Sequence, residues 1–246
     1  MASCLPLFFT LQSIILLHIL THTQNLHNTS TRRSVISFLM HQLTEDDEDY
    51  EDELSNLSAS WQLPVQPPTS STQTQQQRKR LYIPISDQFG ASRLAFTRPG
   101  GGYHWSILLW DIVTSYKKVD DDGFSAVVDV GFHHFDSSKG LNELAAKAVA
   151  EKLQKVLHTS MSKDVRITDV VEVVECKTPQ QRNGYDCGVL ALGFAEALSV
   201  CDDHGFAKEH YESMLQSHFE TNGGHENFAL GLRKKIGDDI RQLARE

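Results

Sequence analysis

One junction in the last third of the chain constrains the fold more than any other feature. Residues 180–186 form a wholly polar turn, which ends abruptly at Cys187–Ser199 (CGVLALGFAEALS), a segment that is apolar on nearly every side. A helix of this composition is stable only when other elements surround it. The chain must therefore build a core around residues 187–199 and leave the polar turn at the edge of that core.

Strand patterns precede this segment, and helical patterns lie on both sides of it. Apolar runs predict strands at residues 81–85, 104–113, 124–135 and 167–174. A turn at residues 117–123 joins the second and third of these strands and predicts a β-hairpin. Helical spacing of apolar residues predicts helices over 141–157, 206–219 and 227–244. Strands first and helices laid against them predict an α+β domain.

Composition narrows the class of protein. The chain has 246 residues, 40% of them hydrophobic and 22% charged, which excludes collagen, a coiled-coil rod and wholesale disorder. The formal net charge is −9. Eight acidic residues lie in Glu45–Glu53, and the rest of the chain is nearly neutral. A broad nucleic-acid-binding face is not expected, because phosphate neutralisation needs clustered Lys and Arg.

We divide the chain into three parts. Residues 1–33 are an N-terminal segment, apolar over 5–20 and then polar. Residues 34–80 contain a short apolar stretch that could be a helix, the acidic run, and a Pro/Gln/Ser/Thr-rich stretch at 64–80. That stretch has a single apolar residue besides proline, so we expect a flexible linker. Residues 81–246 have the composition of a packed domain.

The apolar run at 5–20 leaves two alternatives open. It is shorter than the roughly 20 residues that span a membrane, no Lys or Arg precedes it, and no clear cleavage site follows it. An apolar helix packed on the domain, or an incorrectly assigned first exon, is the preferred interpretation. Secretion or membrane anchoring, and with it a different function, is the minority alternative.

Cysteine usage indicates a reduced environment. The four cysteines form neither a paired zinc pattern nor a disulfide framework, so we expect a cytoplasmic or nuclear protein. His133 and His134 are adjacent, and neighbours on a strand point to opposite faces. They are therefore poorly placed to share a metal ion, and we expect no metal and no cofactor.

Cys187 is the candidate nucleophile. It stands at the start of the apolar helix, where free backbone N–H groups and the helix dipole favour a thiolate over a thiol. The thiolate is the reactive form. Gly188 beside it lets a substrate backbone approach closely. The alternative is that Cys187 is an inert core cysteine.

His104 and Asp136 are the candidate partners of this thiol. His104 follows a glycine-rich turn and opens one strand of the expected hairpin, and Asp136 ends the other. The outer ends of antiparallel strands lie side by side, so the imidazole and the carboxylate should meet. A base oriented by a third group is the arrangement of acid–base triads. A surface histidine and a helix-capping aspartate are the alternatives.

Three motifs together carry a resemblance to a known family. They are G-x-HW ending at Trp105, F-x-x-FDS around Asp136, and Q-x-NGYDCG from Gln181 to Gly188. The combination resembles the Ulp and sentrin-specific cysteine proteases of ubiquitin-like proteins, most closely the deneddylase branch, over about residues 81–246. The resemblance implies a papain-like α+β fold, with a central mixed or antiparallel sheet flanked by helices and the nucleophile at the N-terminus of a buried helix.

The resemblance also implies a role for each motif residue. His104 would be the general base and acid, Asp136 its orienting partner, Cys187 the nucleophile and Gln181 a donor to the oxyanion. Trp105 would cover the narrow C-terminal tail of the substrate; a core aromatic is the alternative.

The activity implied is cleavage after the C-terminal Gly-Gly of a ubiquitin-like modifier, with the neddylation modifier and its conjugates, such as cullins, as partners. A SUMO protease would use the same catalytic residues. A modifier-binding protein with impaired catalysis is the non-enzymatic alternative.

Two features depart from the family pattern. Thirty-two positions separate His104 from Asp136, so we expect a longer hairpin than is usual, with residues 117–123 at its tip. The family's Trp-Leu-Asn-Asp segment near the start of the domain is missing, and Trp61 stands in Ser-Trp-Gln-Leu instead. In the family, that segment forms the second wall of the tunnel that binds the C-terminal tail of the modifier, so its absence affects how the substrate is bound.

Overall fold

The computed structural model describes residues 75–86, 104–119, 123–160, 165–167, 172–199 and 207–243. These residues form a mixed sheet and four helices, which confirms the α+β class. The elements are β1 (Gln75–Ser86), β2 (Trp105–Val119), β3 (Gly123–Phe135), α4 (Glu143–Ser160), β4 (Val165–Ile167), β5 (Val173–Cys176), α5 (Cys187–Ser199), α6 (Lys208–Thr221) and α7 (His225–Leu243).

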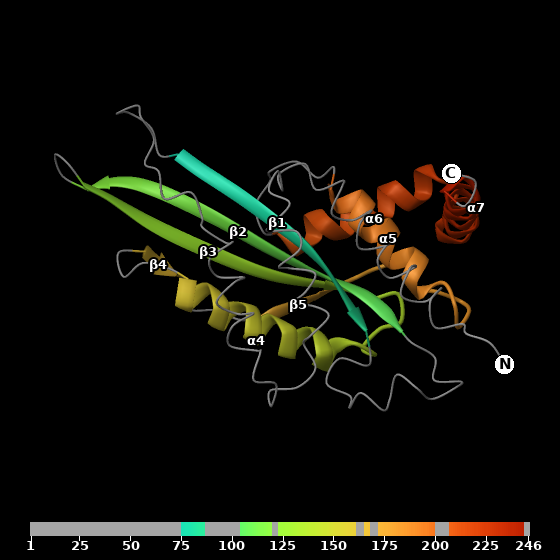
Figure 1. Cartoon of the computed structure of the whole chain (residues 1–246), viewed down its shortest axis with the longest axis horizontal. Coiled ribbons are helices and arrows are strands. Elements are labelled where there is room, and N and C mark those ends of the chain that lie inside the picture. Colours follow the sequence, from blue (N-terminus) through green and yellow to red (C-terminus); the bar gives the residue numbers. More distant parts are fainter. Residues whose placement is uncertain are drawn as a thin grey trace.

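The predicted β2–β3 hairpin is present and is the longest pairing in the sheet. Its register runs from Val119 opposite Gly123 to Ile107 opposite Phe135. β1 pairs antiparallel with β2, while β4 and β5 each pair in parallel with β3. β2 and β3 continue well beyond the helices at the tip of the hairpin (Figure 1). The long spacing between His104 and Asp136 is thus taken up by an extended hairpin, as expected.

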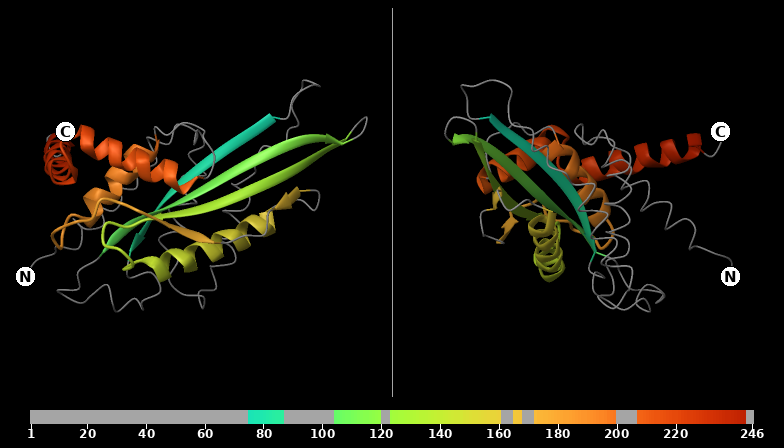
Figure 2. Two further views of the ribbon diagram at one scale, coloured as in Figure 1. Left: turned by 180° about the vertical axis from the view of Figure 1, so that it is seen from behind. Right: turned by 60° about the vertical axis from the view of Figure 1, so that its left-hand side comes forward.

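Helices cover both faces of the sheet. α4 runs along one face, α5 and α6 lie against the other, and α7 packs on the outer side of α5 and α6 (Figures 1 and 2). The α4 face buries alternate residues of β2 and β3, such as Leu108, Trp110 and Phe132. The opposite face buries the intervening residues, such as Leu109 and Phe135, against α5 and α6. This two-residue alternation decides which side chains of the hairpin point toward α5.

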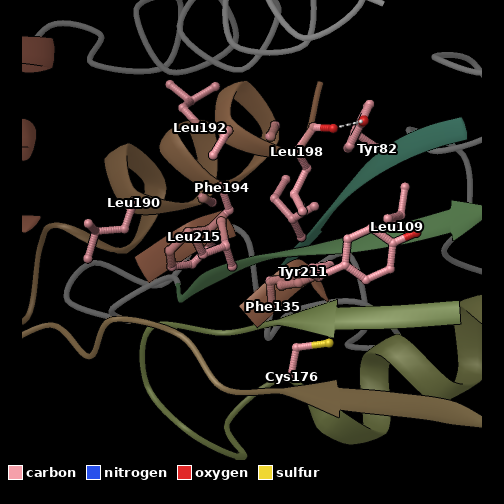
Figure 3. Packing of buried hydrophobic residues seen from close by; sticks show 14 of the residues in the cluster. Tyr82, Leu109, Phe135, Cys176, Leu190, Leu192, Phe194, Leu198, Tyr211 and Leu215 are labelled. Atoms are coloured by element: carbon pink, nitrogen blue, oxygen red, sulfur yellow. Dashed lines mark hydrogen bonds between the residues drawn. The ribbon is translucent and has the colours of Figure 1, made fainter. Parts of the chain in front are cut away.

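α5 is buried nearly all round, as its sequence predicts. Nine of its 13 residues are buried, and they pack on β2, β3, α6 and α7 (Figure 3). Gly193 marks the contact with α7, because a Cβ there would collide with the ring of Phe228. Removing this helix from water fixes the position of its first residue, Cys187, relative to the sheet.

The predicted linker is wrong over its last six residues. Residues 75–80 belong to β1 and pair with β2. These six residues include no apolar side chain, so this part of the strand is stabilised by backbone pairing and by the ion pairs of Arg78 and Arg80 with the buried Asp111. Arg78 Nε donates to Asp111 Oδ1 at 2.8 Å, and Tyr211 of α6 donates to Oδ2 of the same carboxylate at 2.6 Å. Composition alone could not reveal these long-range partners.

Other boundaries differ in detail. The strand predicted at 167–174 is two short strands, β4 and β5. The predicted helices at 141–157, 206–219 and 227–244 are confirmed as α4, α6 and α7, each shifted by one to three residues at its ends. The predictions for residues 1–74, including the acidic run and the apolar segment, fall outside the described residues. Within the part of the chain that the structure describes, no helix is long and apolar enough to cross a membrane.

Candidate active site

The ends of β2 and β3 bring the predicted base and its partner together. His104 Nε2 lies 2.5 Å from Asp136 Oδ1, although 32 positions separate the two residues. Both side chains are buried, with 6% of His104 and 2% of Asp136 exposed. A buried carboxylate can only accept, so Nε2 carries the proton of this bond. The other ring nitrogen, Nδ1, is left to face Cys187.

The loop that follows β3 fixes the Asp136 carboxylate. The backbone N–H of Ser138 donates to Oδ1 at 2.8 Å, and that of Asn142 donates to Oδ2 at 3.3 Å. The backbone carbonyl of Asp136 accepts from Thr178 Oγ1 and from Gln180 Nε2. Both oxygens of the carboxylate therefore have fixed donors, which keep the group aimed at the imidazole.

Cys187 stands where α5 begins, and its thiol hydrogen-bonds to His104. Burial favours the neutral thiol, but the hydrogen bond from His104, backbone hydrogen bonds at Trp105 and Gly188 and the positive charge of the imidazole together lower the pKa of Cys187 below its ordinary value. The start of a helix adds a favourable dipole. The geometry therefore favours a thiolate.

His104 carries the complementary charge. Burial by itself lowers the pKa of the imidazole, whereas the hydrogen bonds to Asp136 and Cys187 and the two negative charges raise it to about 9. A thiolate and an imidazolium thus form an ion pair, with Asp136 behind the ring. Such a pair can attack a carbonyl through sulfur and then protonate the leaving group from Nδ1.

The polar turn before Cys187 is held in one conformation. Asn183 Oδ1 accepts from the backbone N–H groups of Tyr185 and Asp186, and Asn183 Nδ2 donates to the Asp186 carboxylate at 2.6 Å. From α7, Arg233 donates to the same carboxylate at 2.6 and 2.9 Å and to the carbonyl of Tyr185 at 2.7 Å. The turn that carries the nucleophile is therefore tied to the C-terminal helix.

Two hydrogen bonds to Ser137 orient Gln181 at the same site. The Gln181 backbone N–H donates to the carbonyl of Ser137 at 2.9 Å, and Ser137 Oγ donates to Gln181 Oε1 at 3.0 Å. Because Oε1 is occupied, the amide nitrogen Nε2 is the end left to donate elsewhere. This orientation suits a donor to an oxyanion.

Trp105 and Gly188 lie against each other across the site. A Cβ built on Gly188 would be 3.7 Å from Trp105 Cδ1, and the indole of Trp105 is half-buried. The predicted site residues on β2, β3 and the start of α5 are therefore neighbours.

The paired histidines point to opposite faces, as the strand alternation predicts. His134 contacts Ser106 and Glu175, whereas the ring of His133 packs edge-on to Tyr211 at 4.8 Å. Among the residues with described positions, no three His, Cys, Asp or Glu side chains form a group that could hold a metal ion.

Sequence reasoning missed three residues of the site. Ser137 and Asn142 act through their contacts with Gln181 and Asp136, and Arg233 acts through the turn. Ser137 falls inside the F-x-x-FDS motif and could have been found there. Asn142 and Arg233 carry no local signal, because their partners are distant in the sequence.

Comparison with known proteins agrees with this geometry. Over 116 residues the chain is 35% identical to sentrin-specific protease 8 of Homo sapiens, covering 47% of the chain and 42% of that protein. Over 141 residues it is 30% identical to NEDD8-specific protease 1 of Arabidopsis thaliana, covering 57% of the chain and 50% of that protein. The matched part of the chain thus spans half or less of the length of these curated relatives.

The family assignment rests on a longer match. The model of the Ulp1 protease family, C-terminal catalytic domain, matches residues 12–221. This range contains β1 to α6 with His104, Asp136 and Cys187, and it ends before α7. The papain-like fold and the thiol–imidazole–carboxylate geometry fit that assignment, and the chain belongs to the Ulp1 protease family.

Proposed function

We propose that the protein is a thiol isopeptidase that cleaves after the C-terminal Gly-Gly of a ubiquitin-like modifier. The observation that carries the proposal is the convergence of Cys187, His104 and Asp136, three residues from distant parts of the chain, in one hydrogen-bonded array. The burial of His104 and Asp136 keeps this array out of bulk water, which strengthens its electrostatics.

Acylation follows from the ion pair. The Cys187 thiolate attacks the carbonyl carbon of the terminal glycine, and the C=O electrons move onto oxygen. The backbone N–H of Cys187 and the Gln181 side-chain amide are placed to stabilise this oxyanion. When the tetrahedral intermediate collapses, the C–N bond breaks and His104 gives its Nδ1 proton to the leaving amine, which leaves a thioester on Cys187.

Deacylation uses the same residues in reverse roles. Neutral His104 accepts a proton from water through Nδ1, and the resulting hydroxide attacks the thioester carbonyl. The C–S bond breaks, the modifier leaves with a free carboxylate, and the thiolate–imidazolium pair is restored. Asp136 holds the ring through Nε2 in both steps.

The favoured modifier is NEDD8, and the favoured partners are its conjugates, including cullins. The names of the relatives support this choice, since one of them is a NEDD8-specific protease. The closeness of Trp105 to Gly188, where an added Cβ would lie 3.7 Å from the indole, supports a narrow site that suits a tail without side chains.

Hydrolysis of fluorogenic modifier conjugates tests the proposal. The wild-type chain should release the fluorophore from the NEDD8 conjugate, and Cys187→Ala should abolish release while still binding NEDD8. Turnover of a SUMO conjugate but not of the NEDD8 conjugate would assign the chain to SUMO instead. Loss of NEDD8 from neddylated cullin on a gel then tests the proposed partner.

An electrophilic probe separates an enzyme from a binding module. A NEDD8 vinyl sulfone should form a covalent adduct with Cys187, detected as a mass shift of the intact chain. A folded protein that binds NEDD8 but forms no adduct would indicate that binding, and not hydrolysis, is the function.

We also propose a cytoplasmic or nuclear location. Cys176 is a buried cysteine outside any disulfide, which fits a reducing compartment. Recovery of the tagged chain in a secreted or membrane fraction would contradict this location.

A further inference from the structure

A second layer of polar side chains lies behind the His104–Asp136 pair. Ser106 lies on β2, two positions after His104, and His134 lies on β3, two positions before Asp136. Strand alternation points Ser106 and His134 to the same face of the hairpin, one step further into the sheet than the pair. His134 Nε2 lies 2.8 Å from Ser106 Oγ, and His134 Nδ1 lies 2.6 Å from Glu175 Oε1 on β5. The layer joins three strands directly under the proposed catalytic pair.

The hydrogen bonds of this layer run in one direction. Glu175 is an acceptor when ionised, so His134 Nδ1 carries the proton and Nε2 accepts from the hydroxyl of Ser106. The oxygen of Ser106 in turn accepts from Asn142 Nδ2 at 3.0 Å. Successive hydrogen bonds with the same direction polarise one another, which strengthens the series of hydrogen bonds from Asn142 through Ser106 and His134 to Glu175.

Asn142 connects this series of hydrogen bonds to the catalytic pair. Its Nδ2 also lies 3.2 Å from the carbonyl of His104 and 3.2 Å from the carbonyl of Ile85, and its backbone N–H donates to Asp136 Oδ2. One fully buried side chain therefore touches the backbone of the base and sits on the loop that orients the carboxylate.

Burial decides what this layer can do. Ser106, His134 and Glu175 have the order of a serine-hydrolase triad, but Ser106 and His134 are completely buried. No substrate can reach Ser106 Oγ, so the layer is not a second active site. The layer can affect the catalytic pair only by holding Asn142 in place.

We propose that Ser106, His134 and Glu175 are positioning residues that orient Asn142 and thereby hold His104 and Asp136 in register with Cys187. The proposal rests on the proposed thiol hydrolase function. It adds a buried support behind the reacting groups, and it assigns to His134 a role that its neighbour His133, which points to α6, does not share.

Other charged groups around His134 are also defined. On α4, Glu143 lies near His134 and pairs with Lys147 at 2.6 Å. On α6, Lys208 donates to the backbone carbonyl of Glu175. Among the residues that the structure describes, Glu175 is the carboxylate that bonds to the imidazole of His134, and Glu143 and Lys147 are exposed enough to be screened by salt.

The test compares the same substitution at two adjacent positions. His134→Phe removes both hydrogen bonds of the layer, and His133→Phe alters a buried ring on the opposite face of the same strand. Ser106→Ala is a milder variant that also interrupts this series of hydrogen bonds. It provides the test if His134→Phe does not fold. Glu175→Gln keeps an acceptor for Nδ1–H, whereas Glu175→Ala does not.

Two readouts are measured for each variant. The first is the kcat and KM for the NEDD8 conjugate. The second is the pH dependence of Cys187 alkylation by iodoacetamide, in a Cys4→Ser/Cys201→Ser background. Alkylation needs no modifier, so it remains informative even if the wild-type chain hydrolyses no conjugate, and failure of the proposed function is then seen separately.

We expect His134→Phe and Ser106→Ala to lower kcat by about 10- to 100-fold with little change in KM, because small misplacements of reacting groups are costly. The alkylation midpoint of Cys187 should move upward by about one pH unit as the ion pair weakens. Glu175→Gln should retain most activity and Glu175→Ala should not. The double variant Ser106→Ala/His134→Phe should be no worse than the more impaired single variant.

Two results would overturn the proposal. One is a folded Ser106→Ala or His134→Phe variant with the kcat and the alkylation profile of the wild type. The other is a His133→Phe variant that shows the same losses, because the effect would then reflect general destabilisation of β3 and not orientation through Asn142.

Discussion

His104 Nε2 and Asp136 Oδ1 are 2.5 Å apart, and the carboxylate has fixed backbone donors on both oxygens. Asp136 therefore selects which ring nitrogen of His104 faces Cys187. Asp136→Asn places an amide where the carboxylate accepts, so the ring can turn or change tautomer. We expect kcat to fall by about 100- to 10,000-fold, by analogy with serine triads.

The measurement for Asp136→Asn is steady-state hydrolysis of a NEDD8 conjugate, with circular dichroism as the control for folding. A rate within twofold of the wild type in a folded variant would show that the carboxylate does not orient the base.

The charges of Cys187 and His104 predict a pH profile. The pKa of Cys187 lies below its ordinary value and that of His104 is about 9, so the ion pair persists between the two. As pH falls through the lower pKa, sulfur is protonated and attack slows. As pH rises through about 9, the imidazolium loses the proton that the leaving amine requires. We expect a bell-shaped profile of kcat/KM with its basic limb near pH 9.

Cys176 supplies an internal comparison for this profile. Burial, and then nearby carboxylates, raise the pKa of Cys176 to about 12, so its thiol stays protonated. Iodoacetamide at pH 7 should label Cys187 and leave Cys176 unlabelled, as read by peptide mass spectrometry. Equal labelling of the two cysteines would contradict the assigned ion pair.

Gln181 is expected to act in the transition state. Gln181→Ala removes the side-chain donor to the oxyanion, and we expect kcat to fall by about 100-fold with KM nearly unchanged. Ser137→Ala frees the carboxamide to rotate and should give a smaller loss in the same direction. Gln216→Ala on α6 is the control, since Gln216 is exposed and contacts Glu220. A change in KM alone would place Gln181 in substrate binding instead.

The helices and strands could be predicted from the sequence more fully than the contacts of the site. Cys187–Ser199 was predicted with its observed bounds, because composition alone determines a helix that is buried all round. The meeting of His104 with Asp136 follows from strand pairing, which is a local rule. Asn142 and Glu175 could not be found in this way, since their partners lie on other strands and only the folded sheet brings them together.

The same reason explains the missed start of β1. Residues 75–80 resemble a linker by composition, but Arg78 finds Asp111 33 positions away. A polar strand segment that is held by ion pairs and by pairing with a neighbouring strand leaves no hydrophobic periodicity in the sequence.

Arg233 connects α7 to the turn that carries Cys187. It donates to Asp186 and to the carbonyl of Tyr185, and its guanidinium lies 5.0 Å from the centre of the Tyr185 ring. Arg233→Met should loosen the turn and lower kcat by about tenfold, the effect of roughly 1.4 kcal/mol. Arg233→Lys keeps the charge but not the planar fork, so it should recover only part of the rate.

Arg241→Met is the matched control for Arg233. Arg241 lies on the same helix and pairs with the exposed Asp238, so its loss should leave the rate unchanged. Equal losses in the two variants would mean that α7 acts through its overall charge and not through the turn.

The Asp111 site predicts a change in stability without a change in chemistry. Tyr211 donates to the buried Asp111 carboxylate at 2.6 Å and accepts from Arg78 at 2.9 Å. Burial, and then the Asp111 charge, raise the pKa of Tyr211, so its hydroxyl stays protonated and keeps donating. Tyr211→Phe keeps the ring but deprives a buried charge of a donor, which should lower the free energy of unfolding by about 2 kcal/mol.

Urea unfolding monitored by circular dichroism measures this loss, with Tyr185→Phe as the control. Tyr185 is 69% exposed, and its variant should unfold at the wild-type midpoint. Because Asp111 lies on β2 away from Cys187, the kcat of Tyr211→Phe should equal that of the wild type below its unfolding transition. A lower kcat with unchanged stability would instead tie the α6 contact to the active site.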